Sequence, residues 1–140
     1  MYNILISGYY GFNNIGDESI LRTVIDNLRE KLPGVDITVL SQSPAQTAEK
    51  YGVRAARRMN LRDIFRSVRH CDMLLSGGGS LLQDATSSRS ILYYLLLLRL
   101  AQLLGKRTFI YSQGIGPVSA PRNRRLTASI LRRTDGIVVR

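Results

Sequence analysis

The sequence SGYYGFNNIGDESIL, residues 7–21, follows an apolar run at 3–7 and opens a stretch with helical spacing of apolar residues. A glycine-rich loop between a strand and a helix is typical of a phosphate-binding loop. Here, however, Asp17 and Glu18 stand where such a loop carries Lys-Ser, and a carboxylate repels a phosphate. The loop also lacks the G-x-G-x-x-G spacing of dinucleotide-binding proteins, so neither a nucleoside triphosphate nor a dinucleotide is expected on it.

Short apolar runs alternate with amphipathic stretches along the whole chain. The pattern predicts strands at 3–7, 36–40, 52–55, 72–76, 107–112 and 136–139, and helices near 17–32, 44–51, 61–70, 88–104 and 121–133. Strict alternation of apolar strands with helices indicates a parallel sheet covered by helices on both faces. The predicted fold class is therefore α/β, a doubly wound, Rossmann-like parallel sheet.

Composition limits the class of protein. The 140 residues suit one domain, and 44% hydrophobic with 21% charged residues argue against disorder. The single cysteine, Cys71, excludes an internal disulfide, and no signal sequence precedes the first strand, so a cytoplasmic location is expected. The longest apolar run, ILYYLLLL at 91–98, is too short for a membrane span.

The charge balance predicts an anionic partner. Twenty basic residues against ten acidic ones give a net charge of +10, which suits nucleic acid, a phosphorylated substrate or a lipid headgroup surface. Arg62, Arg66 and Arg69 share one face of a predicted helix. Such a stripe is usually a solvated face, but it would also suit an anionic membrane surface at the inner face of the plasma membrane.

The glycines gather in three of the loops that follow strands. In a sheet of order 3-2-1-4-5-6, ligands bind beyond the carboxyl ends of strands one and four, where the order reverses. The loops after the first, fourth and fifth strands contain glycines, whereas those after the second and third contain none. The substrate-binding residues predicted from these loops are Gly11, Asn14, Gly16, Gly77, Gly78, Gly79, Ser80, Gly114 and Gly116.

The polar residues beside these glycines suit sugar hydroxyls. Asn14, Asp17 and Glu18 can exchange hydrogen bonds with hydroxyls, and one carboxylate can act as a general base. The alternative is structural, with Asp17 capping the helix and Glu18 offsetting its dipole. Beside the other two loops, Gln83, Asp84 and Gln113 offer similar chemistry or plain surface polarity. The sole histidine, His70, is expected far from the glycines, and no metal site is expected.

Three ordered motifs resemble the polysaccharide pyruvyl transferase family, in particular bacterial enzymes that pyruvylate a cell-wall polysaccharide. They are GYYGFNNIGDE at 8–18, SGGGSLLQD at 76–84 and SQGIGP at 112–117, with VVR at 138–140 as a fourth element. The resemblance implies a two-domain fold similar to GT-B glycosyltransferases. Residues 1–140 would form the amino-terminal domain, and the carboxyl-terminal domain would be absent from this chain.

The resemblance also implies a reaction. The family transfers the enolpyruvyl group of phosphoenolpyruvate to two sugar hydroxyls as a cyclic ketal, with release of phosphate and without a cofactor. This domain would hold the lipid-linked saccharide acceptor, with Asp17 or Glu18 as base and Arg140 near the phosphate. Nucleic acid is not an expected partner, the general acid has no candidate here, and the isolated chain is expected to be inactive.

Two other functions remain open. A nucleotide-sugar glycosyltransferase would share the architecture, and turnover of phosphoenolpyruvate or of a nucleotide sugar separates the two. A non-catalytic module that binds anions or a membrane surface would need only the arginines, and its binding would depend strongly on salt.

Overall fold

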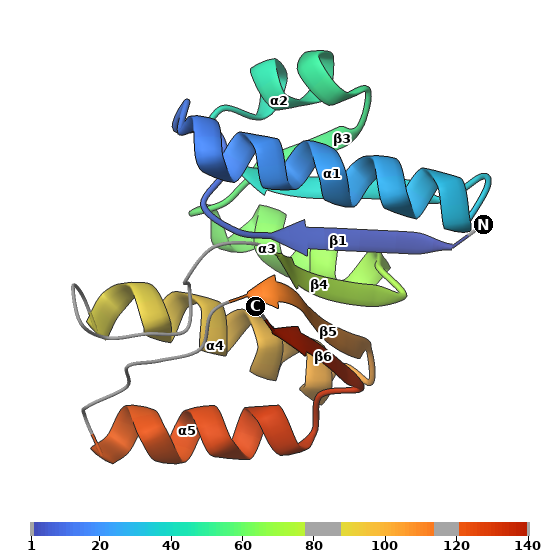
Figure 1. The fold of residues 1–140 in the computed structure, drawn as a ribbon. Helices are drawn as coiled ribbons and strands as arrows, with labels where there is room; N and C mark the ends of the chain where they lie inside the picture. The colour runs from blue at the N-terminus through green and yellow to red at the C-terminus, as the bar shows by residue number, and fades with distance from the viewer. Residues whose placement is uncertain (1, 78–87, 114–120, 140) are drawn as a thin grey trace.

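The computed structural model describes residues 2–77, 88–113 and 121–139 (Figure 1). It contains one sheet and helices on both of its faces. The strands are β1 Asn3–Ser7, β2 Asp36–Ser41, β3 Arg54–Arg57, β4 Met73–Gly77, β5 Arg107–Gln113 and β6 Gly136–Val139. The helices are α1 Ile15–Lys31, α2 Pro44–Tyr51, α3 Leu61–His70, α4 Ser88–Leu103 and α5 Pro121–Arg132.

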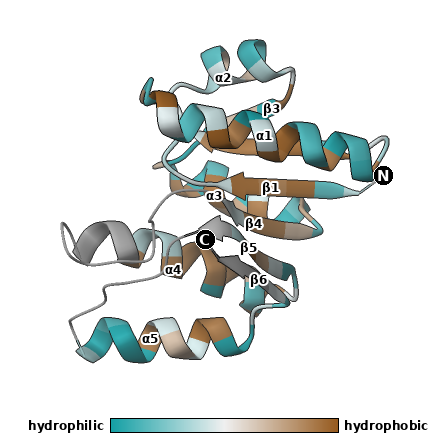
Figure 2. Ribbon diagram, in the orientation of Figure 1, coloured by the Kyte–Doolittle hydropathy of each residue, from teal (hydrophilic) through white to brown (hydrophobic). Residues whose placement is uncertain are grey.

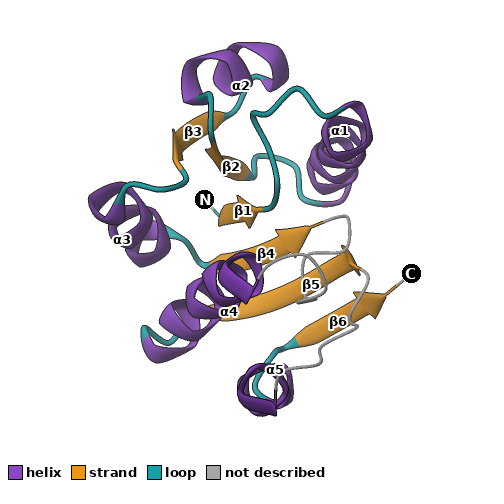
Figure 3. Cartoon of the chain, turned by 90° about the vertical axis from the view of Figure 1, so that its left-hand side faces the viewer, coloured by secondary structure: helices purple, strands orange, loops and turns teal. Residues whose placement is uncertain are grey.

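All strands of the sheet are parallel and lie in the order β3-β2-β1-β4-β5-β6. β1 occupies the centre, where Leu5 pairs with Leu74 of β4 and Ile4 pairs with Ile37 of β2. The connections reverse direction between β1 and β4, which is where a doubly wound sheet leaves a crevice at its carboxyl edge. The predicted fold class is confirmed, and Figure 3 looks onto that edge.

Side-chain alternation along the strands builds two hydrophobic cores. Ile4 and Ile6 of β1 point to the face covered by α1 and α2, whereas Leu5 between them points to the face covered by α3, α4 and α5. The first core includes Leu21, Val24 and Ile25 of α1, and the second includes Ile64, Val68, Leu95, Leu98, Ala101 and Ile130. Apolar residues of α1 accordingly lie on the side that meets the strands (Figure 2).

Local signals in the sequence explain where helices begin and end. Pro44 begins α2, and Gly52 ends it in the left-handed conformation, with φ 64°. This glycine corrects the prediction for the third strand, which was expected at 52–55 and begins instead at Arg54. Residue 52 terminates a helix in a conformation that a strand cannot use, so the chain becomes extended only after it.

Candidate functional site

The loop between β1 and α1 is folded tightly against the loop after β2. Gly11 has φ 87°, and a side chain there would place its Cβ 2.6 Å from the backbone nitrogens of Gln42 and Ser43. The Ser43 hydroxyl donates to the Gly11 carbonyl at 2.9 Å, and the Gln42 N–H donates to the Tyr10 carbonyl at 3.0 Å. Gly11 is therefore required by the close approach of two loops at the carboxyl edge.

Tyr10 connects this loop to the end of β4. Its hydroxyl donates to the Gly77 carbonyl at 2.6 Å, and the side chain is fully buried. A Cβ on Gly77 would lie 3.2 Å from the Tyr10 hydroxyl and 3.3 Å from Leu75, so a side chain there would require these neighbours to shift slightly. Burial, and after it the charge of Asp17, raises the pKa of Tyr10. The expected meeting of the first and fourth strand loops is thus confirmed for the residues that the structure describes.

Asn14 caps α1. Its side-chain oxygen accepts the backbone N–H of Asp17 at 3.1 Å, which satisfies one of the free amides of the first turn. The expectation that Asp17 caps the helix is therefore wrong. The helix begins three residues earlier than that expectation required, at Ile15, and Gly16 lies exposed in its first turn.

Glu18 is held by contacts within the protein. Its Oε2 accepts the Gly11 N–H at 3.2 Å, and its Oε1 accepts the Tyr51 hydroxyl at 2.8 Å. Lys50 adds an ion pair at 3.8 Å, and only 11% of the Glu18 side chain is exposed. Burial first, and then the hydrogen bond to Glu18, raises the pKa of Tyr51. Glu18 thus ties the glycine loop to α1 and α2, and its carboxylate lies on the α2 side of the loop.

Asp17, the neighbouring acid, acts through its charge on two tyrosines. Its negative charge raises the pKa of both Tyr10 and Tyr94, although burial is the larger cause in each case. Tyr94 belongs to α4, on the opposite face of the sheet from α1. A half-buried carboxylate that acts on both phenols therefore lies close to the point where strand order reverses.

Arg58 joins three segments at the same edge. Its guanidinium carbon lies 4.7 Å from the ring centroid of Tyr93, 5.1 Å from that of Phe12 and 5.8 Å from that of Tyr9. Its Nη2 donates to the Tyr94 hydroxyl at 3.0 Å, and the Tyr93 hydroxyl donates to the Arg58 carbonyl. Tyr9 and Phe12 stack with their centroids 4.0 Å apart. We call Arg58, Tyr9, Phe12, Tyr93 and Tyr94 the arginine cluster.

Sequence reasoning missed the arginine cluster. The loop after β3 has no glycine, and the distribution of glycines therefore indicates the other loops. The available signal was the Tyr-Tyr pair in each of two segments, together with a basic residue directly after a strand. Aromatic faces attract a guanidinium, which makes these residue types natural partners once the fold brings them together.

Several predicted site residues lie outside the described residues. These are Gly78, Gly79, Ser80, Gln83, Asp84, Gly114, Gly116 and Arg140. Gln113 ends β5, and its backbone pairs with Val139 of β6. Gly77 ends β4 beside Tyr10, as described above. The roles assigned to all of these residues stay predictions.

The described part of the chain lacks two kinds of feature. No three or more His, Cys, Asp or Glu side chains come together there in a group that could hold a metal ion. None of the described helices has the length and apolar character needed to cross a membrane.

A family model matches residues 14–140, under the description polysaccharide pyruvyl transferase. The chain belongs to this family. The match covers the capped start of α1 and everything after it, including all of the sheet except β1. The resemblance inferred from the motifs is thereby confirmed. A search of curated proteins finds no match.

Solved structures add a likeness of fold. The chain is similar to apo saccharopine dehydrogenase (L-Glu forming) from Saccharomyces cerevisiae, with a TM-score of 0.57 and 19% identity, over 99% of this chain and 26% of that one. It is similar to an α-glucosyltransferase solved with UDP and DNA, with a TM-score of 0.57 and 14% identity, over 98% of this chain and 37% of that one. At these identities the likeness shows the Rossmann-like fold alone.

Proposed function

We propose that this domain holds the sugar acceptor for a pyruvyl transfer, at the carboxyl edge of β1 and β4. The donor in this proposal is phosphoenolpyruvate and the acceptor is a lipid-linked saccharide of a cell-wall polysaccharide. The observation that carries it is the family match over residues 14–140, which includes Asp17 at the edge where the crevice is expected. Membership in a transferase family supports a group-transfer reaction at this edge of the sheet.

The proposed chemistry needs a base but no oxidation or reduction. The C3 methylene of phosphoenolpyruvate gains a proton, and C2 becomes electrophilic. One sugar oxygen bonds to C2 and loses its proton, then a second oxygen bonds to C2 as the C–O bond to phosphate breaks. One hydroxyl proton balances the proton gained by C3, and the other leaves with inorganic phosphate. A positioned carboxylate is suited to accept such a proton.

We assign the base to Asp17, because Glu18 has a structural role in the loop. Both oxygens of Glu18 accept hydrogen bonds, from Gly11 and Tyr51, and loss of these hydrogen bonds would detach the glycine loop from α1 and α2. Burial, and to a lesser degree the charge of Asp17, raises the pKa of Tyr94, whose hydroxyl accepts a hydrogen bond from Arg58. Because the Tyr94 oxygen accepts from Arg58, the Tyr94 O–H group can donate a hydrogen bond to an oxygen of the sugar. Arg140 remains the candidate for the phosphate.

The test measures phosphate release from phosphoenolpyruvate by the full-length protein, with and without a lipid-linked saccharide. Asp17→Asn is expected to lower kcat by about 10²–10⁴-fold while the affinity for phosphoenolpyruvate stays nearly unchanged. Asp26→Asn is the matched control, since Asp26 is an exposed acid of the same helix. Full activity of Asp17→Asn would remove the assigned base. Turnover of a nucleotide sugar in place of phosphoenolpyruvate would overturn the proposed reaction.

A further inference from the structure

The two helical faces of the sheet differ sharply in charge. α3, α4 and α5 contain nine arginines and a single acidic residue, Asp63, whereas α1 and α2 contain five acidic and four basic residues. The first set therefore carries a net charge of +8 out of the total of +10. Because charges act mainly within about 10 Å at moderate salt, an anionic partner would meet this face rather than the other.

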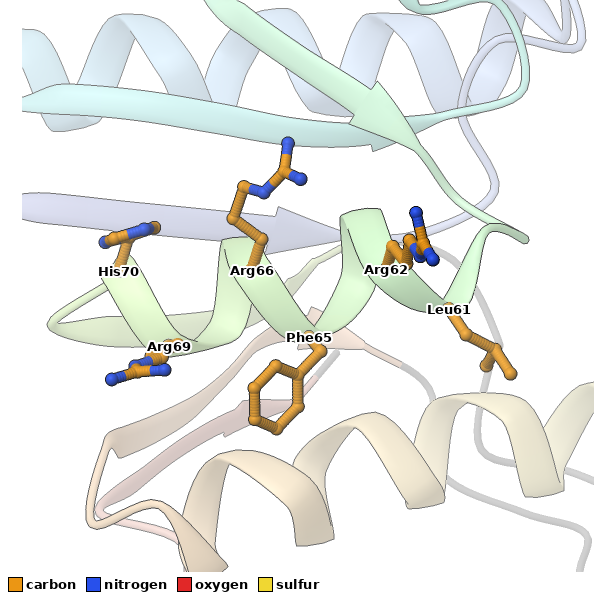
Figure 4. A pocket seen from close by; sticks show the side chains of 6 residues that line it. All are labelled: Leu61, Arg62, Phe65, Arg66, Arg69 and His70. Atoms are coloured by element: carbon orange, nitrogen blue, oxygen red, sulfur yellow. The ribbon is translucent and has the colours of Figure 1, made fainter.

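α3 presents apolar and basic side chains together on its exposed side. Leu61 is 82% exposed and Phe65 is 46% exposed, although both are large and apolar. Figure 4 shows that these two residues project on the same side of the helix. Together with Arg62, Arg66, Arg69 and His70 they line a shallow depression of about 590 Å³. We call these six residues the α3 surface.

The arginines of the α3 surface keep their charge available. The one acid of the helix, Asp63, accepts three hydrogen bonds from Arg57, at 2.8 Å from Nε, 3.3 Å from Nη2 and 3.1 Å from the backbone N–H. These hydrogen bonds are the main cause that lowers the pKa of Asp63, and the charge of Arg66 adds a smaller effect, so Asp63 is compensated mainly by a residue outside the α3 surface. Across the described residues, Arg62, Arg66 and Arg69 form no salt bridge.

We propose that the α3 surface docks this domain on an anionic lipid bilayer. Arginines attract phosphate headgroups, and exposed leucine and phenylalanine beside them gain by entering the boundary between headgroups and acyl chains. α4 lies beside α3, and its Leu96 is also exposed, at 59%. A nucleic acid would match the arginines equally well, but it would leave Leu61 and Phe65 in water. The pairing of the two chemistries on one helix therefore favours a membrane.

The charge part of the proposal is tested by vesicle flotation of the full-length protein. Vesicles of phosphatidylcholine are compared with vesicles in which roughly one lipid in three is phosphatidylglycerol. Arg62→Gln/Arg69→Gln is expected to weaken binding to the anionic vesicles by about 25-fold, or about fivefold per arginine. The control Arg22→Gln/Lys31→Gln removes two exposed charges of α1, on the other face of the sheet, and is expected to change binding by less than about twofold. Equal losses in the two doubles would overturn the proposal.

The apolar part is tested with Leu61→Ser/Phe65→Ser. This variant is expected to float poorly with anionic vesicles yet to bind a single-stranded oligonucleotide as the parent protein does. If it loses stability, Leu61→Ser alone replaces it, since Leu61 contributes little to the core at 82% exposure. Unchanged flotation of a folded Leu61→Ser variant, or equal binding to neutral and anionic vesicles, would refute membrane docking. No substrate is present in these assays, so their outcome is independent of the proposed reaction.

Discussion

Replacing Glu18 by glutamine should lower the free energy of unfolding by about 2 kcal/mol. Glu18 accepts the Gly11 N–H and the Tyr51 hydroxyl, one on each oxygen, and the side chain is 11% exposed. Glutamine has the same shape but only one acceptor oxygen and no charge. One of the two donors therefore faces an NH₂ group in the variant, and the other keeps only a neutral hydrogen bond.

The magnitude comes from these contacts taken one at a time. A hydrogen bond to a charged group contributes about 1.5–3 kcal/mol, against about 0.5–1.5 kcal/mol for a neutral one. The Lys50 ion pair adds less than about 1 kcal/mol, because the Lys50 side chain is 52% exposed and the two charged atoms are 3.8 Å apart. Tyr51 can rotate its hydroxyl to accept from the new amide, which recovers part of the loss. A net effect of about 2 kcal/mol remains.

Urea denaturation followed by circular dichroism measures this loss, with Glu30→Gln as the control. Glu30 is an exposed acid of the same helix, and its replacement should change stability by less than about 0.5 kcal/mol. A chain of this size should also lose roughly 6–10 °C of melting temperature in Glu18→Gln. A Glu18→Gln variant that is as stable as the parent but turns over about 10²–10⁴-fold more slowly would refute this reasoning, because Glu18 would then act as the base.

Three further predictions follow from single contacts. Gly11→Ala should lower the free energy of unfolding by roughly 2–5 kcal/mol, measured by thermal unfolding, because the new side chain has a positive φ and also clashes with the β2–α2 loop. Gly105→Ala is the control, since Gly105 has a positive φ but nothing within 4 Å, and it should lower the free energy of unfolding by about 1–2 kcal/mol. Burial raises the pKa of Tyr93 to about 12 from 10.0. The neutral phenol should therefore contribute its full share of the free energy of unfolding below pH 10, and this share should fall as pH rises toward 12. In Tyr93→Phe, the loss of stability between pH 10 and 12 should be smaller than in the parent protein. Burial also raises the pKa of Cys71 to about 11, and at 4% exposure its reaction with a thiol reagent should be slow until urea unfolds the chain.

The order of the strands was predictable from sequence because few topologies satisfy strict alternation. Right-handed crossovers and helices on both faces leave little choice once the apolar runs are placed. The end of α2 was harder, because Gly52 can begin a strand or end a helix with equal local ease. Its left-handed φ accompanies a hydrogen bond from its backbone N–H to the Ala48 carbonyl, which ends the helix. Boundaries of this kind depend on hydrogen bonds that composition does not record.

The candidate site also has features that the sequence predicts and features that it does not. The glycine loop and its position beside β4 followed from spacing, because carboxyl ends of neighbouring parallel strands share one edge. Asn14 and Asp17 are about equally good capping residues, so sequence could not choose between them. The arginine cluster depends on contacts between residues 9–12, Arg58 and the two tyrosines of α4. Segments so distant in sequence meet only in the folded chain.

The contacts of Glu18 explain why a loop with phosphate-loop spacing carries acids. In a phosphate loop, backbone N–H groups point into the loop and bind an external anion. Here the Gly11 N–H is occupied by Glu18 from the first turn of the helix, at 3.2 Å. The loop therefore contains its own anion, and a phosphate would have to displace a carboxylate that Tyr51 and Lys50 also hold. Tyr9, which is 41% exposed, stacks on Phe12 in the same loop, and an exposed aromatic face suits a sugar better than a phosphate, in agreement with the proposed acceptor site.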